Sequence, residues 1–375
     1  MVHNIENNKN TLTNLMQKVS EQAAKSADFL APTNDLEKTT SASGIPQIRI
    51  EASRGEPTKI FDINDVAFSQ IATHAGIDTR TARRLQAQYS NEFDTLTNAI
   101  WQKEPTRRML RTHLNNDETT GTARAFVSDR FKTFDNVNLL QSALPQLMES
   151  EAQFQVVNAD LTEKRLYLRL KSLNQTGTGA GLGDVMANGI GLQNSEVGAG
   201  SVSVYQIAWT LACLNGMQTQ NKTRSSHITS ARDGDDWGLL SDAAKNADNR
   251  ALELKIRDLV GAYSSKDMFN EVLEKMQKAS NDIIEGEFID ATDVVNNLGK
   301  VMQLTKKENN DVLNGLMATI GQAGFEQSKP ISRATLVNAV TAVSHRADLD
   351  DVDQWQIRGG QVLDMSARDW ARVAA

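Results

Sequence analysis

The sequence is poor in cysteine, proline and aromatic residues. Its 375 residues include one Cys and 6 Pro, and aromatic side chains make up 5% of the chain. The single cysteine, Cys213, excludes an intramolecular disulfide framework and a zinc site built on several thiolates. With 23 Gly, the composition also excludes collagen-like and proline-rich low-complexity chains. These features predict a globular protein of a reducing compartment, and hence a cytoplasmic location.

Several functional signatures are missing as well. No apolar stretch approaches the roughly 18 residues of a membrane span, and the polar start MVHNIENNKN lacks the basic-then-apolar order of a signal peptide. The five His are not spaced as metal ligands. No GxSxG, HExxH or SxxK motif occurs, and the glycine-rich segment Asn174–Gly200 contains no GxxxxGK[ST] phosphate loop. We therefore expect no enzymatic activity, no metal, no cofactor and no membrane partner.

Charge is distributed unevenly along the chain. The formal net charge is −7 and the isoelectric point is about 5.4, yet residues 71–232 carry +3 and residues 233–375 carry −8. Because binding to a polyanion depends on local potential, the low isoelectric point does not exclude a nucleic-acid partner. A middle segment that is less acidic by chance would show the same counts.

Sequence patterns divide the chain into three parts. Residues 1–45, rich in Asn, Ser and Thr, predict a flexible N-terminal arm with at most a short helix over Leu12–Phe29. Residues 46–232 mix strand and helix patterns, which predicts an α+β core domain with a central antiparallel sheet and flanking helices. Residues 233–375 repeat apolar positions at helical spacing, which predicts an acidic helical C-terminal region.

A helix-turn-helix pattern lies near the start of the core. In FSQIATHAGIDTRTARRL, the small residue Ala72, the turn glycine Gly76 and the apolar positions Ala82 and Leu85 have the spacing of two short packed helices. The second helix then carries Arg80, Arg83 and Arg84. Two interpretations stay open, a DNA-reading unit and a helical pair whose arginines are only solvated.

Strand patterns dominate the middle of the core. KEPTRRMLRTHL predicts a basic helix, and Thr122–Phe131 predicts a strand with Ala123, Ala125 and Val127 on one face. Phe154–Leu173 predicts two strands joined by a turn near Leu161–Lys164. On the second of these, a leucine face is expected against the core and a basic face outward, and a plain solvent-facing sheet would show the same alternation. The basic face consists of Arg165, Tyr167, Arg169 and Lys171.

Four separated motifs then follow in order between Thr122 and Met217. They are the strand RAFVSDRF, the turn DN, the motif NSEVG and the motif CLNG. In this order they resemble the phage- and plasmid-like family called domain of unknown function 932, although Phe131 stands where tyrosine is usual. The family name assigns no activity. The order of elements is also broadly similar, at the level of the fold, to single-strand annealing proteins of phages and plasmids.

The resemblance implies a function in the DNA metabolism of a mobile element. The expected function is single-stranded DNA binding and strand annealing by a homo-oligomeric ring or filament, with affinity from phosphate contacts and counterion release. Asp129 and Glu196 are expected to orient the arginines. The alternatives are a helix-turn-helix regulator that binds duplex DNA, and an interaction or anti-defence protein without nucleic-acid affinity. The expected nucleic-acid-binding residues are Arg124, Arg130, Lys132, Arg165, Tyr167, Arg169, Lys171, Lys222 and Arg224.

Overall fold

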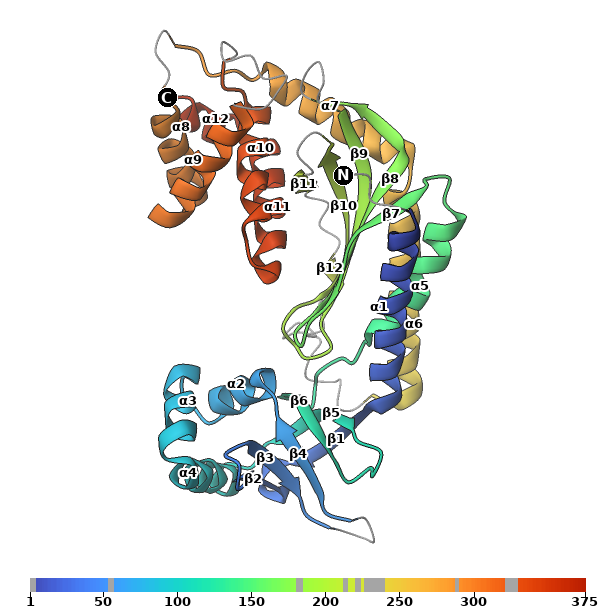
Figure 1. The fold of residues 1–375 in the computed structure, drawn as a ribbon, viewed down its shortest axis with the longest axis vertical. Coiled ribbons are helices and arrows are strands. Elements are labelled where there is room, and N and C mark those ends of the chain that lie inside the picture. The colour runs from blue at the N-terminus through green and yellow to red at the C-terminus, as the bar shows by residue number, and fades with distance from the viewer. Residues whose placement is uncertain are drawn as a thin grey trace.

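The structure is a computed structural model. It describes residues 5–52, 57–179, 185–211, 215–219, 224–225, 240–286, 290–320 and 330–375. Two six-stranded sheets organise the chain, sheet 1 near the N-terminus and sheet 2 in the middle. They lie in two lobes, and the helices after sheet 2 extend the lobe that contains it (Figure 1). Helices and a mostly antiparallel arrangement of strands confirm the α+β class.

The predicted flexible arm is wrong for residues 5–40. The long helix α1 (Ile5–Lys25) is followed by the strands β1 (Ser26–Pro32) and β2 (Leu36–Thr40), with the 3-10 turn Thr33–Asp35 between them. Leu15 and Val19 of α1 are buried in the core of the second lobe, while β1 belongs to sheet 1. The N-terminal segment therefore spans both lobes, and its polar composition reflects the solvent side of an amphipathic helix.

Sheet 1 is curved. Its strand order is β1-β5-β6-β4-β3-β2, so β1 and β2 lie at opposite edges although only three residues connect them. Six flat strands at roughly 4.8 Å spacing would separate the edges by about 24 Å, which exceeds the reach of about 14 Å for such a connection. The sheet must therefore bend its edges toward each other. The remaining strands are β3 (Pro46–Ile50), β4 (Lys59–Ile63), β5 (Arg107–Leu114) and β6 (Thr120–Ser128).

Three helices cover one face of sheet 1. They are α2 (Asp65–His74), α3 (Thr79–Gln88) and α4 (Ser90–Lys103), and α2 packs on β6 while α4 packs on β2. Their shared core contains Phe61, Phe93, Trp101 and Phe126. The helices begin where the sequence offers caps, since the side chains of Asn64 and Asp78 accept from backbone N–H groups at 2.9 and 3.0 Å.

Two predictions in sheet 1 are wrong. The basic segment predicted as a helix is the strand β5, whose Arg111 is almost fully buried. The predicted faces of β6 also change, because the β5–β6 register shifts and leaves Arg124 as an extra residue between Ala123 and Ala125. Ala123 and Phe126 therefore belong to the same core cluster, while Ala125 and Val127 belong to another.

Sheet 2 confirms the predicted hairpin. Its order is β11-β10-β9-β8-β7, with β12 paired to β10. Leu166, Leu168 and Leu170 pack into the core formed with α1 and two further helices, which lie side by side on one face of the sheet (Figure 1). Pro145 lies inside the helix Asn136–Glu149 without ending that helix. The elements are α5 (Asn136–Glu149), β7 (Phe154–Leu161), β8 (Leu166–Thr178), β9 (Val185–Asn194), β10 (Val202–Thr210), β11 (Asn215–Gln218), β12 (Arg224–Ser225) and α6 (Asp242–Tyr263).

Ten residues of the glycine-rich segment Asn174–Gly200 form the strand β9. Gly189 and Gly191 make this strand possible, because a Cβ at either position would lie 2.1–2.3 Å from the ring atoms of Trp209 or Tyr205 on β10. Glycine here lets two large rings lie flat across the neighbouring strand. A strand rich in glycine gives no alternating pattern, and this is why the sequence did not predict it.

The C-terminal region is helical, as predicted. Its core includes Leu298, Leu316, Val340 and Val362. The C-terminal helix packs against α8, and its Val373 is buried. After α6 come α7 (Lys266–Asn281), α8 (Ala291–Met302), α9 (Lys306–Ile320), α10 (Arg333–Ala342), the 3-10 turn Val343–His345, α11 (Leu349–Leu363) and α12 (Ala367–Val373).

Two features are absent from the described residues. No helix among them combines the length and apolar character needed to cross a membrane. Over the same part of the chain, no group of three or more His, Cys, Asp or Glu side chains is arranged to hold a metal ion.

Candidate nucleic-acid interface

The expected binding residues do not gather on one surface. Arg124 lies between the two sheets, and Lys132 lies next to α6. Arg165 immediately precedes β8, which carries Tyr167, Arg169 and Lys171. Lys222 lies outside the described residues, and Arg224 is described only through the backbone pairing of β12 with β10. Each group has its own set of contacts.

Arg124 is part of a buried junction between the lobes. Its guanidinium donates to the Glu196 carboxylate at 2.8 Å, and both residues are buried. The second carboxylate oxygen of Glu196 accepts from the backbone N–H of Asn136 at 2.7 Å. Glu196 thus orients Arg124, as expected, and it also joins sheet 1 to the start of α5. A guanidinium held in this way is not available to a phosphate.

Arg111 completes the junction from the neighbouring strand. It donates to the carboxylates of Asp28 and Asp135 at 3.0 and 2.7 Å and to the carbonyl oxygen of Glu196 at 2.8 Å. Burial disfavours its charge, but the two carboxylates outweigh this cost and raise its pKa. Beside it, burial together with Arg124, Lys25 and Arg111 lowers the pKa of His113 to about 4.

Three of the four sequence motifs meet at this junction. Arg124 comes from RAFVSDRF, Asn136 from DN, and Glu196 from NSEVG. In the last motif, Asn194 donates to the carbonyl oxygen of Phe134 at 2.9 Å, and Gly198 turns the chain with a φ of +76°. The motifs therefore share a structural task here, the joining of the two sheets.

The basic face of β8 is covered instead of exposed. Tyr167 and Arg169 are buried, with 0% and 2% of their surface accessible, so Tyr167 is not a stacking platform. Arg165 is half-buried and donates from Nε to the carbonyl oxygen of Ala199 at 2.9 Å. Lys171 is also half-buried. The alternation along β8 is confirmed, but the expected outward orientation to solvent is wrong.

Asp353 of α11 explains the burial of Arg169. Its Oδ1 accepts from Arg169, Tyr205 and Gln218 at 2.6, 3.1 and 3.0 Å. Burial and the adjacent Asp353 raise the pKa of the Tyr205 hydroxyl. The pair Arg169–Asp353 is separated by 184 residues in the chain, so no local pattern could reveal it. It attaches the C-terminal helices to sheet 2.

Two further cations of the set lie apart from β8. Lys132 forms an ion pair with Asp248 of α6, and its side chain is 11% exposed. Arg130 is exposed, and its backbone N–H donates to the Ser128 hydroxyl at 3.2 Å. In the described part of the chain, the expected binding residues therefore form no continuous cationic surface.

Helix α3 has a different character. It follows α2 after a turn in which Gly76 adopts a φ of +72°, a conformation that favours glycine. Ala82 is its only fully buried residue, so α3 rests on the lobe through a narrow contact. It lies at the periphery of the lobe that contains sheet 1 (Figure 1). The two predicted helices and the turn between them are present.

The solvent side of α3 is basic. Arg80, Arg83 and Arg84 are exposed, and no acidic residue occurs between Thr79 and Gln88. Among the described residues, neither Arg80 nor Arg84 forms an ion pair with a carboxylate. Within the described residues, this surface thus combines DNA contacts predicted from the sequence with several arginine side chains that extend into solvent.

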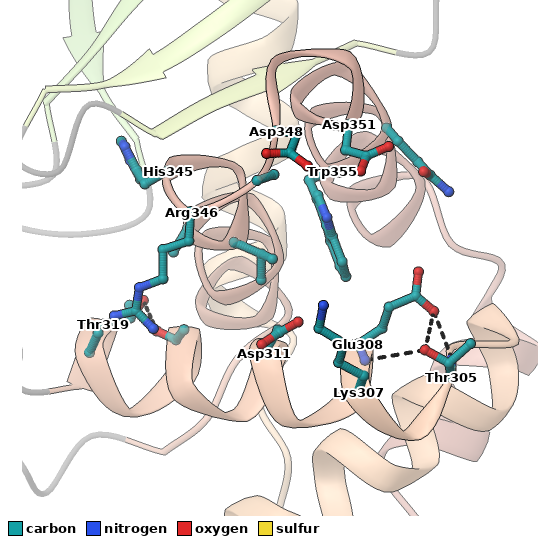
Figure 2. A pocket seen from close by; sticks show the side chains of 16 residues that line it. Thr305, Lys307, Glu308, Asp311, Thr319, His345, Arg346, Asp348, Asp351 and Trp355 are labelled. Carbon is teal, nitrogen blue, oxygen red and sulfur yellow. Dashed lines mark hydrogen bonds between the residues drawn. The ribbon is translucent and has the colours of Figure 1, made fainter. Parts of the chain in front are cut away.

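A cavity of about 630 Å³ lies in the C-terminal helical region, bounded by α9, the 3-10 turn and α11 (Figure 2). Glu308 in its wall accepts from the backbone N–H of Thr305 at 2.7 Å and from Arg358 at 2.8 Å, and these contacts lower its pKa to about 2. Four carboxylates and two cations line the cavity, and this mixture favours no single class of ligand. The charged residues are Lys307, Glu308, Asp311, Arg346, Asp348 and Asp351.

No family model matches the chain, and no match is found among curated proteins or solved structures. The resemblance to the domain of unknown function 932 therefore stays a prediction.

Proposed function

We propose that the protein binds nucleic acid through the outward face of α3. The observation that supports this most is the exposure of Arg80, Arg83 and Arg84 on one short helix that has no acidic residue of its own. Arginine in this setting keeps its charge and offers donors to phosphate oxygens and base edges.

The acidity of the rest of the molecule does not oppose this function. The C-terminal region carries the larger negative charge, and α3 lies in the other lobe (Figure 1). Screening limits the repulsion between exposed charges to about 8 Å at physiological ionic strength. An acidic body also disfavours nonspecific wrapping of DNA, so contact is restricted to the basic helix.

The test is fluorescence anisotropy with labelled DNA at two salt concentrations. The variant Arg80→Ala/Arg84→Ala should lose at least about tenfold in affinity, and the slope of log affinity against log salt should fall by about two, roughly one for each lost phosphate contact. The fold should persist, because neither side chain is part of the core.

The matched control removes two arginines elsewhere. Arg250 and Arg257 of α6 are 69% and 55% exposed and pair with neighbouring acids on the same helix. Arg250→Ala/Arg257→Ala changes the net charge equally and should leave both affinity and slope near those of the wild type. Equal losses in the two double variants would show that only overall charge matters, and the proposal would fail.

Strand annealing by a ring or filament stays a prediction with less support. The residues expected to bind the single strand include Arg124, Lys132 and Arg169, and each of these is paired with a carboxylate. Annealing would require another surface for the single strand. Mass photometry with and without DNA measures the oligomer, and a monomer under both conditions would exclude the ring.

A further inference from the structure

The three arginines of α3 do not share one environment. Arg83 donates to the Asp65 carboxylate at 2.9 Å, and its guanidinium lies 5.7 Å from the ring centroid of Phe68. Both partners belong to α2, and the Phe68 side chain is part of the buried core. Arg83 therefore links the second helix of the pair to the first.

Arg80 and Arg84 lie beside Arg83 on the helix and are not part of its contact with Asp65 and Phe68. They are four residues apart, as are Arg84 and Gln88, so the three side chains follow one face of the helix, opposite the buried Ala82. The Arg84 Nε donates to the Gln88 side-chain oxygen at 3.4 Å, which brings the two side chains together at the surface. Arginine and glutamine are the side chains that pair most readily with the edges of guanine and adenine.

The dimensions of α3 match one nucleic-acid groove. Ten residues make a helix about 15 Å long, and the major groove of B-form DNA, about 12 Å wide, admits an α-helix. The major groove of A-form RNA is too narrow and deep for side chains to read. A single strand offers no groove in which a protruding helix could lie, and no aromatic side chain lies on the outward face of α3 for bases to stack on.

We propose that α3 binds the major groove of duplex DNA through Arg80, Arg84 and Gln88, while Arg83 is a positioning residue that fixes α3 on α2. This rests on the proposed function and deepens it by naming the substrate class. It also divides the three arginines into two that touch the target and one that acts through the helix pair.

The substrate class is tested with one labelled sequence offered as a duplex and as each of its single strands. The duplex should bind at least about tenfold more tightly, and the preference should disappear in Arg80→Ala/Arg84→Ala. In site selection from a randomised duplex pool, Gln88→Ala should lose roughly tenfold of discrimination at one base pair. If single strands bind as tightly as the duplex and still depend on Arg80 and Arg84, the proposed function stands and this inference fails. If nothing binds, both fail.

The role of Arg83 is tested by whether Asp65→Asn lowers or raises the affinity for duplex DNA. Asp65→Asn frees Arg83 and removes a negative charge that is 73% exposed. If Arg83 positions α3, duplex affinity should fall roughly threefold. If Arg83 is one more phosphate contact, affinity should rise, because the competing carboxylate is gone. Arg83→Ala should give the same fall as Asp65→Asn with an unchanged salt slope, and a slope lower by about one would overturn the assignment.

A charge-exchange variant separates the loss of the Asp65–Arg83 contact from a general loss of structure. Asp65→Arg/Arg83→Asp restores the ion pair with its direction reversed, and net charge is unchanged. Affinity should return to within about twofold of the wild type if the contact between helices is what matters. If the exchange abolishes binding while thermal unfolding is unaltered, Arg83 itself contacts DNA. Arg83→Lys, which keeps the pairing charge, should lie close to the wild type.

Discussion

Arginine has opposite environments in two regions of this molecule. On α3, Arg80 and Arg84 are exposed and form no ion pair with a carboxylate in the described part of the chain, whereas Arg111, Arg124 and Arg169 are buried and each is bound to a carboxylate. Under the proposed function, the same residue type serves binding in one region and cohesion in the other. A count of basic residues along the chain cannot separate exposed from buried arginines, because a buried arginine needs a carboxylate partner that only the fold brings near it.

The buried arginines have a physical reason to be paired. Removal of a guanidinium from water costs several kcal/mol unless a carboxylate and further hydrogen bonds compensate it. At the junction and on sheet 2, the compensating groups come from distant segments, as with Arg169 and Asp353. Such pairs fix how elements meet, so a change in one partner should affect stability far more than any change on α3.

The largest effect is expected at Asp353. Asp353→Ala should lower the free energy of unfolding by about 3–5 kcal/mol, because it leaves the buried Arg169 guanidinium without its counter-charge. Denaturant unfolding followed by circular dichroism measures this. Asp364→Ala, which breaks the exposed pair with Lys275, should cost less than about 1 kcal/mol. Similar losses in both variants would remove the distinction between buried and exposed pairs.

A smaller effect is expected at the junction. Glu196→Gln keeps the size of the side chain but replaces one acceptor oxygen with a donor, so it cannot accept from both Arg124 and the Asn136 N–H. The expected loss is about 1–3 kcal/mol. Glu149 of α5 is exposed, and Glu149→Gln should change stability by no more than about 0.5 kcal/mol. No loss in Glu196→Gln would mean that the junction does not hold the sheets.

The smallest expected effect is a change in the pKa of His113. The pKa of His113 lies at about 4, lowered by burial first and then by Arg124 and its other cationic neighbours, and Arg124→Met should raise it in an NMR titration. The folded pKa lies below the unfolded value of about 6.5, so protonation favours unfolding, and stability falls as the pH drops from about 6.5 to 4. The pKa of His74 is also about 4, owing to burial and Arg108.

His74 provides the internal control for that titration. Because Arg124 is not among the causes of its shift, its pKa should stay unchanged in Arg124→Met. Equal movement of both histidines would indicate a general loosening of the lobe. An unmoved His113 would place Arg124 away from it and contradict the described junction.

Elements with strong local patterns could be predicted from the sequence. The β7–β8 hairpin, the α2–α3 pair and the C-terminal helices follow from periodicity, caps and the turn glycine Gly76. The sequence predicts a helix where β5 lies, because RRMLRTHL carries no strict alternation, and Arg111 interrupts its apolar positions with a charge that only distant acids can neutralise.

The partners of the buried cations could not be predicted. Asp353, Asp248 and Asp28 lie in segments whose local sequence gives no sign of a contact with sheet residues. The sequence predicts an orienting role for Asp129 and Glu196, and Glu196 does pair with the buried Arg124. The sequence therefore predicts which side chains share the basic face of β8. It does not predict that the C-terminal helices bury this face, because that depends on contacts between distant parts of the chain.

The most direct test of the comparison is arginine footprinting by phenylglyoxal modification, read by mass spectrometry with and without duplex DNA. We expect fast modification of Arg80 and Arg84 in the free protein, protection of both by duplex DNA, and slow modification of Arg111 and Arg169 under both conditions. Fast modification of Arg169 that DNA slows, with no protection of α3, would contradict binding through α3 and would indicate a binding surface on the central sheet.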